Sequence, residues 1–105
     1  MSGVLEQLEQ HLIHRKTAAA DKSYVASLYG KGIDVILKKL GEETTETIIA
    51  VKSGSKPQVV HEAADLVFHL MVMLTHQDIR WAEVLSELER RSGRSGLEEK
   101  AARQP

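Results

Sequence analysis

GEETTETIIAV, residues 41–51, begins with three carboxylates within about one helical turn and ends as an apolar segment. A second stretch, HEAADLVFHLMVML at residues 61–74, places Glu62 and Asp65 inside the most hydrophobic run of the chain. Apolar residues recur mostly at spacings of three and four, which predicts helices in both stretches. The acids therefore need an explanation, because each group lies on a helix that must also bury apolar side chains.

The same periodicity continues outward from these stretches and predicts an all-α fold, a helical bundle of about four to five helices. No alternating pattern typical of strands competes with it. The expected helices cover residues 4–13, residues 24–29, a long segment from Asp34 to residue 53, a segment from Pro57 to about His76, and residues 81–91. The expected boundary residues are Ser23 and Asp34 as N-caps, Gly30 with Gly32 as a stop, and Gly54 and Gly93 as helix ends.

Gly41 lies inside the expected long helix, although glycine is a poor helix former. A glycine there costs about 1 kcal/mol relative to alanine. We interpret its presence as a sign of close packing or of a close approach by a ligand.

Composition excludes several functional classes. The 105 residues suit one domain, expected over residues 1–93, followed by a polar and flexible tail over residues 94–105. A formal net charge of -1 offers no basic surface for nucleic acid or a membrane. Without cysteine there is no disulfide, thiolate metal site or cysteine nucleophile. With neither a signal peptide nor an apolar run of about 18 residues, a cytoplasmic protein is expected.

The two long helices are joined by the short segment SGSK, residues 53–56, so we expect an antiparallel pair. At about 100 degrees per residue, Glu42, Glu43 and Glu46 share one face of the first helix. Glu62 and Asp65 project together from the second. Five acids on facing helices repel one another unless a cation lies between them. Mg²⁺ or Mn²⁺ suits this set, because hard cations prefer carboxylate oxygen and keep waters that substrate phosphates replace.

A solvated helix face is the competing explanation. Lys38 with Glu42, and Lys39 with Glu43, are i,i+4 pairs that would form a salt-bridged surface. One stripe of the next helix holds Gln58, Glu62, Asp65, His69 and His76, which would be its wet side. Either cluster alone fits both explanations, whereas two clusters on neighbouring helices favour a metal site.

Two other kinds of metal site are excluded by spacing. HEAAD begins like the zinc-protease pattern HExxH, but Asp65 stands where the second histidine is required. A ferritin-like di-iron site needs two Glu-x-x-His motifs, which the sequence lacks. His61 and His69 are accordingly expected to be surface or packed histidines.

The pattern E-E-x-x-E, followed after 15 intervening residues by E-x-x-D, resembles the signature of the all-α nucleoside triphosphate pyrophosphohydrolases, the MazG-like superfamily. Within it, residues 22–91 most resemble the phosphoribosyl-ATP pyrophosphatases of histidine biosynthesis. The supporting segments are KSYVASLYGKGIDVILKKLGEETTE, EAADLVFHLMVML and WAEVLSELERR. The acidic motif specifies only the superfamily, and the context before it adds the finer resemblance.

The resemblance implies a Mg²⁺-dependent enzyme that hydrolyses phosphoribosyl-ATP to phosphoribosyl-AMP and pyrophosphate. It assigns Glu43, Glu46, Glu62 and Asp65 to the metal, for which the carboxylate chemistry also allows Mn²⁺ as a substitute. Glu42 is then a candidate for a second metal or for activating water, beside Glu43 and Glu46 as catalytic residues. A homodimer with shared active sites is expected, both from the superfamily and because residues 57–76 are apolar around most of the helix.

The substrate contacts are expected just before the acids, from Ser23, Tyr24, Lys31, Lys38 and Lys39. The lysines would contact a triphosphate, whose negative charge persists in the transition state. Arg90 and Arg91 are weaker candidates for the same role. Tyr24 would meet the base or ribose, although an aromatic in a short helix is more often part of the core.

Two other functions stay open at this point. One is a house-cleaning nucleoside triphosphate pyrophosphohydrolase of the same superfamily, with the same metal site and a different base pocket. The other is a non-enzymatic helical interaction module, in which the acids are only solvated faces.

Overall fold

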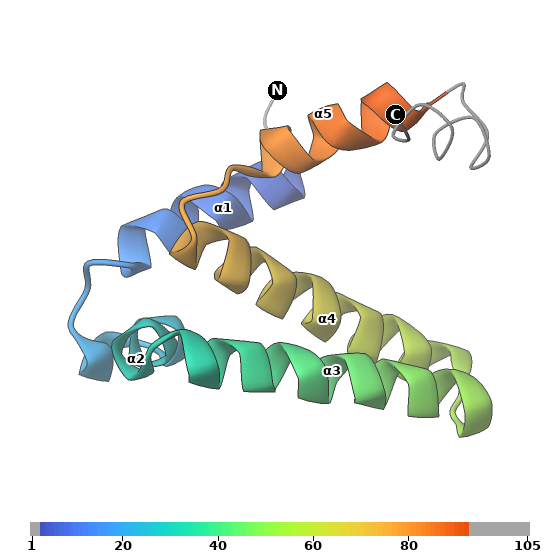
Figure 1. The fold of residues 1–105 in the computed structure, drawn as a ribbon. Coiled ribbons are helices and arrows are strands. Elements are labelled where there is room, and N and C mark those ends of the chain that lie inside the picture. The colour runs from blue at the N-terminus through green and yellow to red at the C-terminus, as the bar shows by residue number, and fades with distance from the viewer. Residues whose placement is uncertain (1–2, 93–105) are drawn as a thin grey trace, which may run out of the picture.

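The computed structural model describes residues 3–92, which fold into α-helices and one 3₁₀ turn with no strand among them (Figure 1). The elements are α1 (Val4–Arg15), η1 (Ala20–Lys22), α2 (Tyr24–Lys31), α3 (Ile33–Ser53), α4 (Lys56–His76) and α5 (Trp81–Arg91). The expected all-α fold is therefore confirmed. None of these described helices combines the length and the apolar character needed to cross a membrane. Gly93 and the expected tail of residues 94–105 lie outside the described residues.

Helices α3 and α4 form the predicted antiparallel hairpin, which is the most extensive helix contact in the described chain (Figure 1). Gly54 ends α3, and a Cβ there would lie 2.7 Å from the Ala50 carbonyl oxygen. Ser55 caps α4 in a capping box, in which its own N–H donates to Gln58 Oε1 at 2.8 Å. Pro57 lies in the first turn, as expected, because its missing N–H is not needed there.

The junction between α2 and α3 differs from the prediction. Ser23 caps α2 as expected, accepting the Ala26 N–H at 3.1 Å. Gly30 does not stop that helix, which continues through Lys31. Gly32 ends α2 and also begins α3, at a φ of 96° that glycine adopts without strain. The prediction of Asp34 as the N-cap was wrong, since this residue lies in the first turn, where a carboxylate favours the helix dipole.

The core lies where α1, α2, the start of α3 and the second half of α4 meet. Its buried members are Leu12, Val25, Leu28, Ile36, Met71, Val72 and Leu74. Each fully buried aliphatic side chain contributes about 1.5–3 kcal/mol relative to an exposed one. This junction anchors one end of the hairpin and leaves its other end to extend away from α1 and α5 (Figure 1).

A buried acid holds α5 against α1. Glu9 is 4% exposed, and its Oε2 accepts the Trp81 N–H at 2.5 Å while its Oε1 accepts Arg80 at 3.0 Å. The first N–H groups of a helix have no partner within the helix, so Glu9 satisfies one of them for α5. Burial tends to raise the pKa of Glu9, but the bonds from Arg80 and Trp81 and the Arg80 charge outweigh it and hold the pKa below its ordinary value.

Apolar side chains remain exposed on the hairpin. On α3 the residues Leu37, Gly41, Thr44, Ile48 and Val51 follow one another at spacings of four and three, and we call them the exposed stripe. Ile48 is 60% exposed and Val51 63% exposed. The prediction placed the surplus apolar surface on α4, yet α3 carries more of it. Gly41 does not pack closely within the described chain, because a Cβ there would meet no atom within 4 Å.

Candidate metal centre

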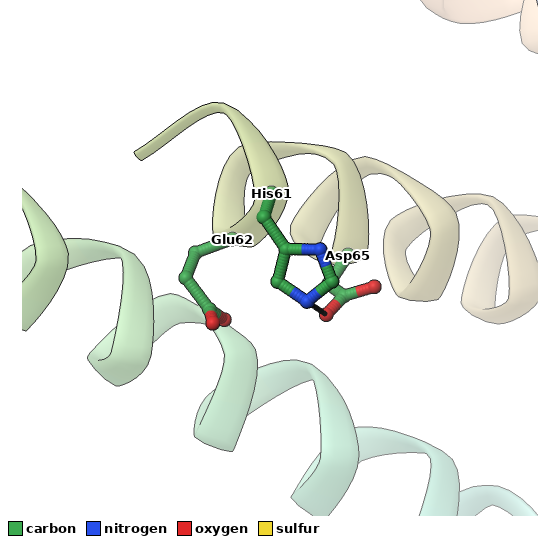
Figure 2. A group of neighbouring side chains, drawn as sticks. All are labelled: His61, Glu62 and Asp65. Atoms are coloured by element: carbon green, nitrogen blue, oxygen red, sulfur yellow. Dashed lines mark ion pairs between the residues drawn. The ribbon is translucent and has the colours of Figure 1, made fainter. Parts of the chain in front are cut away.

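The acids of α3 and α4 come together between the two helices. Carboxylate oxygens of Glu43, Glu46 and Glu62 all lie within 4.8 Å of one another. A second group, with the same spacing of ligand atoms, joins His61, Glu62 and Asp65. Figure 2 shows the imidazole of His61 beside the Asp65 carboxylate, with the Glu62 side chain directed toward α3. Glu62 belongs to both groups and so connects the four expected ligands, Glu43, Glu46, Glu62 and Asp65, which we call the carboxylate cluster.

Local spacing and one contact between the helices bring these acids together. Glu43 and Glu46 are three residues apart on α3, as Glu62 and Asp65 are on α4, so each pair shares a helix face. The hydroxyl of Thr47 lies 2.7 Å from the Glu43 carbonyl oxygen and 3.2 Å from that of Glu62. Its one proton is thus shared between the two backbones. Sequence reasoning missed Thr47, whose polar side chain among the acids was the only signal for it.

Two oxygens of the cluster are buried without a hydrogen-bond partner in residues 3–92, namely Glu43 Oε2 and Glu62 Oε2. Burial raises the pKa of Glu43, and the neighbouring charges of Glu46 and Asp65 raise it further. Burial likewise raises the pKa of Glu62, and the adjoining Glu46 carboxylate adds to this. Buried anionic oxygens are costly unless a positive group meets them. Carboxylate oxygens that lack a hydrogen-bond partner are suitable ligands for a hard divalent cation.

Glu42 stands apart from the two ligand groups. It pairs with Lys39, whose Nζ lies 3.4 Å from Glu42 Oε2. Neither of the expected i,i+4 pairs, Lys38 with Glu42 or Lys39 with Glu43, forms within residues 3–92. The salt-bridged face is therefore the wrong explanation for Glu43, which faces other acids instead.

The other expected site residues divide by environment. Lys31 and Lys38 are exposed, and Ser23 has its hydroxyl engaged as a cap. Arg90 and Arg91 pair with Glu87 on their own helix.

Tyr24 is 52% exposed, so its interpretation as a core residue was wrong. Its Oη lies 3.0 Å from Nε2 of His69, a buried histidine as expected. His61, by contrast, is a surface residue whose Nε2 lies 3.4 Å from Asp65 Oδ2, the contact dashed in Figure 2. The Tyr24–His69 contact was not predicted, because 45 residues separate the two positions.

A hollow of about 240 Å³ adjoins the cluster at the turn end of the hairpin. Its lining residues are Glu46, Ile49, Ala50, Ser53, Gly54, Gln58 and Glu62. A larger hollow of about 430 Å³ lies between α1 and α5 and contains no residue of the cluster. Of these two hollows, only the smaller one is lined by residues of the cluster, Glu46 and Glu62.

An all-α chain with a carboxylate cluster across an antiparallel hairpin has the architecture expected of the all-α nucleoside triphosphate pyrophosphohydrolases. Comparison with known proteins identifies the family within that class. Residues 5–92 match the family model described as phosphoribosyl-ATP pyrophosphohydrolase. The chain therefore belongs to this family.

Curated relatives agree over nearly the whole chain. The phosphoribosyl-ATP pyrophosphatase of Methylococcus capsulatus is 58% identical over 100 residues, covering 95% of both chains. That of Rhizorhabdus wittichii is 52% identical over 103 residues, covering 98% of this chain and 97% of the relative. That of Geobacter sulfurreducens is 52% identical, covering 95% of this chain and 93% of the relative.

Proposed function

We propose that this chain is a cytoplasmic enzyme of histidine biosynthesis that hydrolyses phosphoribosyl-ATP to phosphoribosyl-AMP and pyrophosphate, using Mg²⁺ or, as a substitute, Mn²⁺. The observation that carries the proposal is the carboxylate cluster, with two buried and unpartnered oxygens, in a chain of the phosphoribosyl-ATP pyrophosphohydrolase family. An anionic triphosphate and an anionic cluster repel each other. A divalent cation between them resolves that conflict.

Glu43, Glu46, Glu62 and Asp65 would hold the cation. When bound, it would neutralise negative charge on the substrate phosphates. The hydroxyl of Thr47 helps to hold these four residues together, since it donates to the Glu62 carbonyl oxygen and so connects α3 to α4.

The residues outside the cluster would bind the substrate and handle protons. Lys39, held by Glu42, offers its ammonium group to a phosphate, and the exposed Lys38 and Lys31 add further positive charge. Glu42 lies outside the two ligand groups and is the candidate for a second metal, or for orienting a water and accepting its proton. The water oxygen then bonds to phosphorus, the bond to the leaving oxygen breaks, and pyrophosphate departs.

Pyrophosphate release tests the activity. The full chain is assayed with phosphoribosyl-ATP and with a panel of ordinary and modified nucleoside triphosphates, each with Mg²⁺ and with EDTA. We expect turnover of phosphoribosyl-ATP that requires Mg²⁺. Turnover of another triphosphate in its place would retain the carboxylate chemistry but reject the substrate. No turnover with any substrate would favour an interaction module.

We also propose a homodimer in which the exposed stripe of α3 faces a second copy. The support is the four-and-three spacing of the stripe, the pattern of a helix that packs against another helix, with exposed apolar side chains at Leu37, Ile48 and Val51. Ile48→Asp should shift the chain from dimer to monomer in analytical ultracentrifugation. The matched control is Val4→Asp, at an 80% exposed position on α1 outside the stripe. A wild-type monomer at micromolar concentration would contradict this proposal.

A further inference from the structure

Tyr24 and His69 form a pair that joins the start of α2 to the middle of α4. Tyr24 Oη lies 3.0 Å from His69 Nε2, and the two rings meet edge to face with centroids 6.0 Å apart. The histidine is 6% exposed, whereas the tyrosine is 52% exposed. Packing alone does not account for a tyrosine whose ring is half in solvent while its hydroxyl is held by a buried side chain.

The second ring nitrogen of His69 determines the direction of this hydrogen bond. His69 Nδ1 lies 2.8 Å from the carbonyl oxygen of Asp65. A carbonyl only accepts, so Nδ1 carries the hydrogen and donates it. Neutral His69 then has a bare Nε2, which accepts the hydroxyl hydrogen of Tyr24. Because a phenol has one hydrogen, the Tyr24 oxygen can only accept from any other group.

The phenol also lies within the electrostatic field of the site. Burial raises the pKa of Tyr24, the charge of Lys39 lowers it, and the carboxylates of Glu43, Glu42 and Asp65 raise it. Tyr24 thus stands among the residues that surround the cluster. Asp65 connects the Tyr24–His69 pair to the cluster directly, since its backbone carbonyl accepts from His69 and its carboxylate belongs to the cluster.

We propose that His69 is a positioning residue that fixes Tyr24 as a hydrogen-bond acceptor at the rim of the carboxylate cluster. The group it receives is an O–H donor, either a sugar hydroxyl of the substrate or a water molecule at the cluster. An unprotonated phosphate oxygen is not accepted, since it has no hydrogen to donate. This inference rests on the proposed function and adds a specificity element to it. His69 itself touches no substrate and acts through Tyr24.

Paired substitutions test the proposal by steady-state kinetics. Tyr24→Phe removes only the acceptor oxygen and should lower kcat/KM about tenfold, the usual scale for one hydrogen bond. His69→Asn keeps an N–H near the position of Nδ1 but loses the partner of Tyr24, so it should match Tyr24→Phe. His69→Gln restores an acceptor near the position of Nε2 and should retain most of kcat/KM.

The double variant Tyr24→Phe/His69→Asn should be no worse than either single variant, because the two residues act as one unit. Additive losses would overturn the proposal. The control is Tyr29→Phe, which removes the hydroxyl of the chain's other tyrosine, bonded to Thr75. It should leave kcat/KM unchanged. Far-UV circular dichroism checks that each variant folds. If His69→Asn does not fold, Tyr24→Phe still tests the proposal, because Tyr24 is half-exposed.

Nitrogen-15 NMR of the full chain without metal gives a readout independent of activity. We expect His69 to carry its hydrogen on Nδ1, and its Nε2 resonance to shift in Tyr24→Phe but not in Tyr29→Phe. A hydrogen on Nε2 with none on Nδ1, or an unchanged resonance in Tyr24→Phe, would overturn the proposal. This measurement tests the Tyr24–His69 hydrogen bond separately from the proposed function, since it can be made even if the wild type releases no pyrophosphate.

Mn²⁺ binding, measured by electron paramagnetic resonance without substrate, identifies the donor. A sugar hydroxyl predicts that Tyr24→Phe raises KM and leaves the Mn²⁺ affinity unchanged. A water at the cluster predicts a weaker Mn²⁺ affinity with an unchanged KM. If Tyr24→Phe changes neither quantity, the proposal is wrong.

Discussion

The two ends of the α3–α4 hairpin have similar side chains in opposite environments. At the end near α1 and α2, Ile36 and Val72 are 0% exposed. At the turn end, Ile48 is 60% exposed and Val60 is 61% exposed. Neighbouring helices make the difference, because α1 and α2 cover one end and nothing within residues 3–92 covers the other. The carboxylate cluster lies between these ends, with Glu43, Glu62 and Asp65 partly buried and Glu46 exposed.

The largest expected effect separates the two ends directly. Ile36→Ala should lower the free energy of unfolding by about 3 kcal/mol, since it empties a packed site. Ile48→Ala removes the same atoms from an exposed site and should cost under about 0.5 kcal/mol in dilute protein. Urea unfolding measures both. If the exposed stripe is an interface, the cost of Ile48→Ala should rise with protein concentration. Equal costs for Ile36→Ala and Ile48→Ala at every protein concentration would refute the comparison.

The cluster between the ends should respond in activity more than in folding. Glu62→Gln keeps the shape but removes a charge and should lower Mg²⁺-dependent pyrophosphate release about 100-fold, since even partners outside a metal's ligand set matter by about 10- to 100-fold. Its fold should persist, because the change relieves repulsion from Glu46. The control is Glu89→Gln on α5, an exposed position away from the cluster. Equal activity in both variants would remove Glu62 from the site.

The anchor of α5 on the covered side should depend on pH. Glu9→Gln should cost about 2 kcal/mol at pH 7, because it weakens a bond to a charged group and a helix-start N–H bond. The folded-state pKa of Glu9 lies below its ordinary value of 4.5, so its charge stabilises the fold above pH 4.5. That contribution disappears as pH falls through the lower folded-state value. Urea unfolding of the wild type and Glu9→Gln from pH 7 to pH 3 should show the difference between their free energies of unfolding shrinking. A constant difference would contradict this prediction.

The smallest expected effect concerns Gly41, in the exposed stripe. Gly41→Ala should stabilise the isolated chain by about 1 kcal/mol, because the new Cβ meets open space and alanine favours the helix. In a dimer whose partner approaches Gly41 closely, the same methyl group should weaken association. Thermal unfolding and sedimentation, each as a function of concentration, measure the two effects. Ala64→Gly on α4, an exposed helix position, is the reverse control and should destabilise the chain.

The sequence by itself determined the features that depend on short-range spacing. Apolar periodicity located the helices, the SGSK segment with Pro57 predicted the hairpin, and i,i+3 spacing put Glu43 with Glu46 and Glu62 with Asp65 on shared faces. These signals are reliable here because helix geometry relates residues three or four apart regardless of what packs around them. The start of α3 was misplaced because Gly32 indicated only the end of α2, and nothing in the sequence showed that α3 begins at the next residue.

Only the tertiary structure decided the contacts between distant segments. The Tyr24–His69 bond spans 45 residues, and the bond from Trp81 to Glu9 spans 72. It also decided that Lys39 pairs with Glu42, and that α3 carries more of the exposed apolar surface than α4. Helix periodicity says which residues share a face, but the partner of that face depends on how whole helices pack. That choice is set by the sum of many apolar contacts, and no single motif records it.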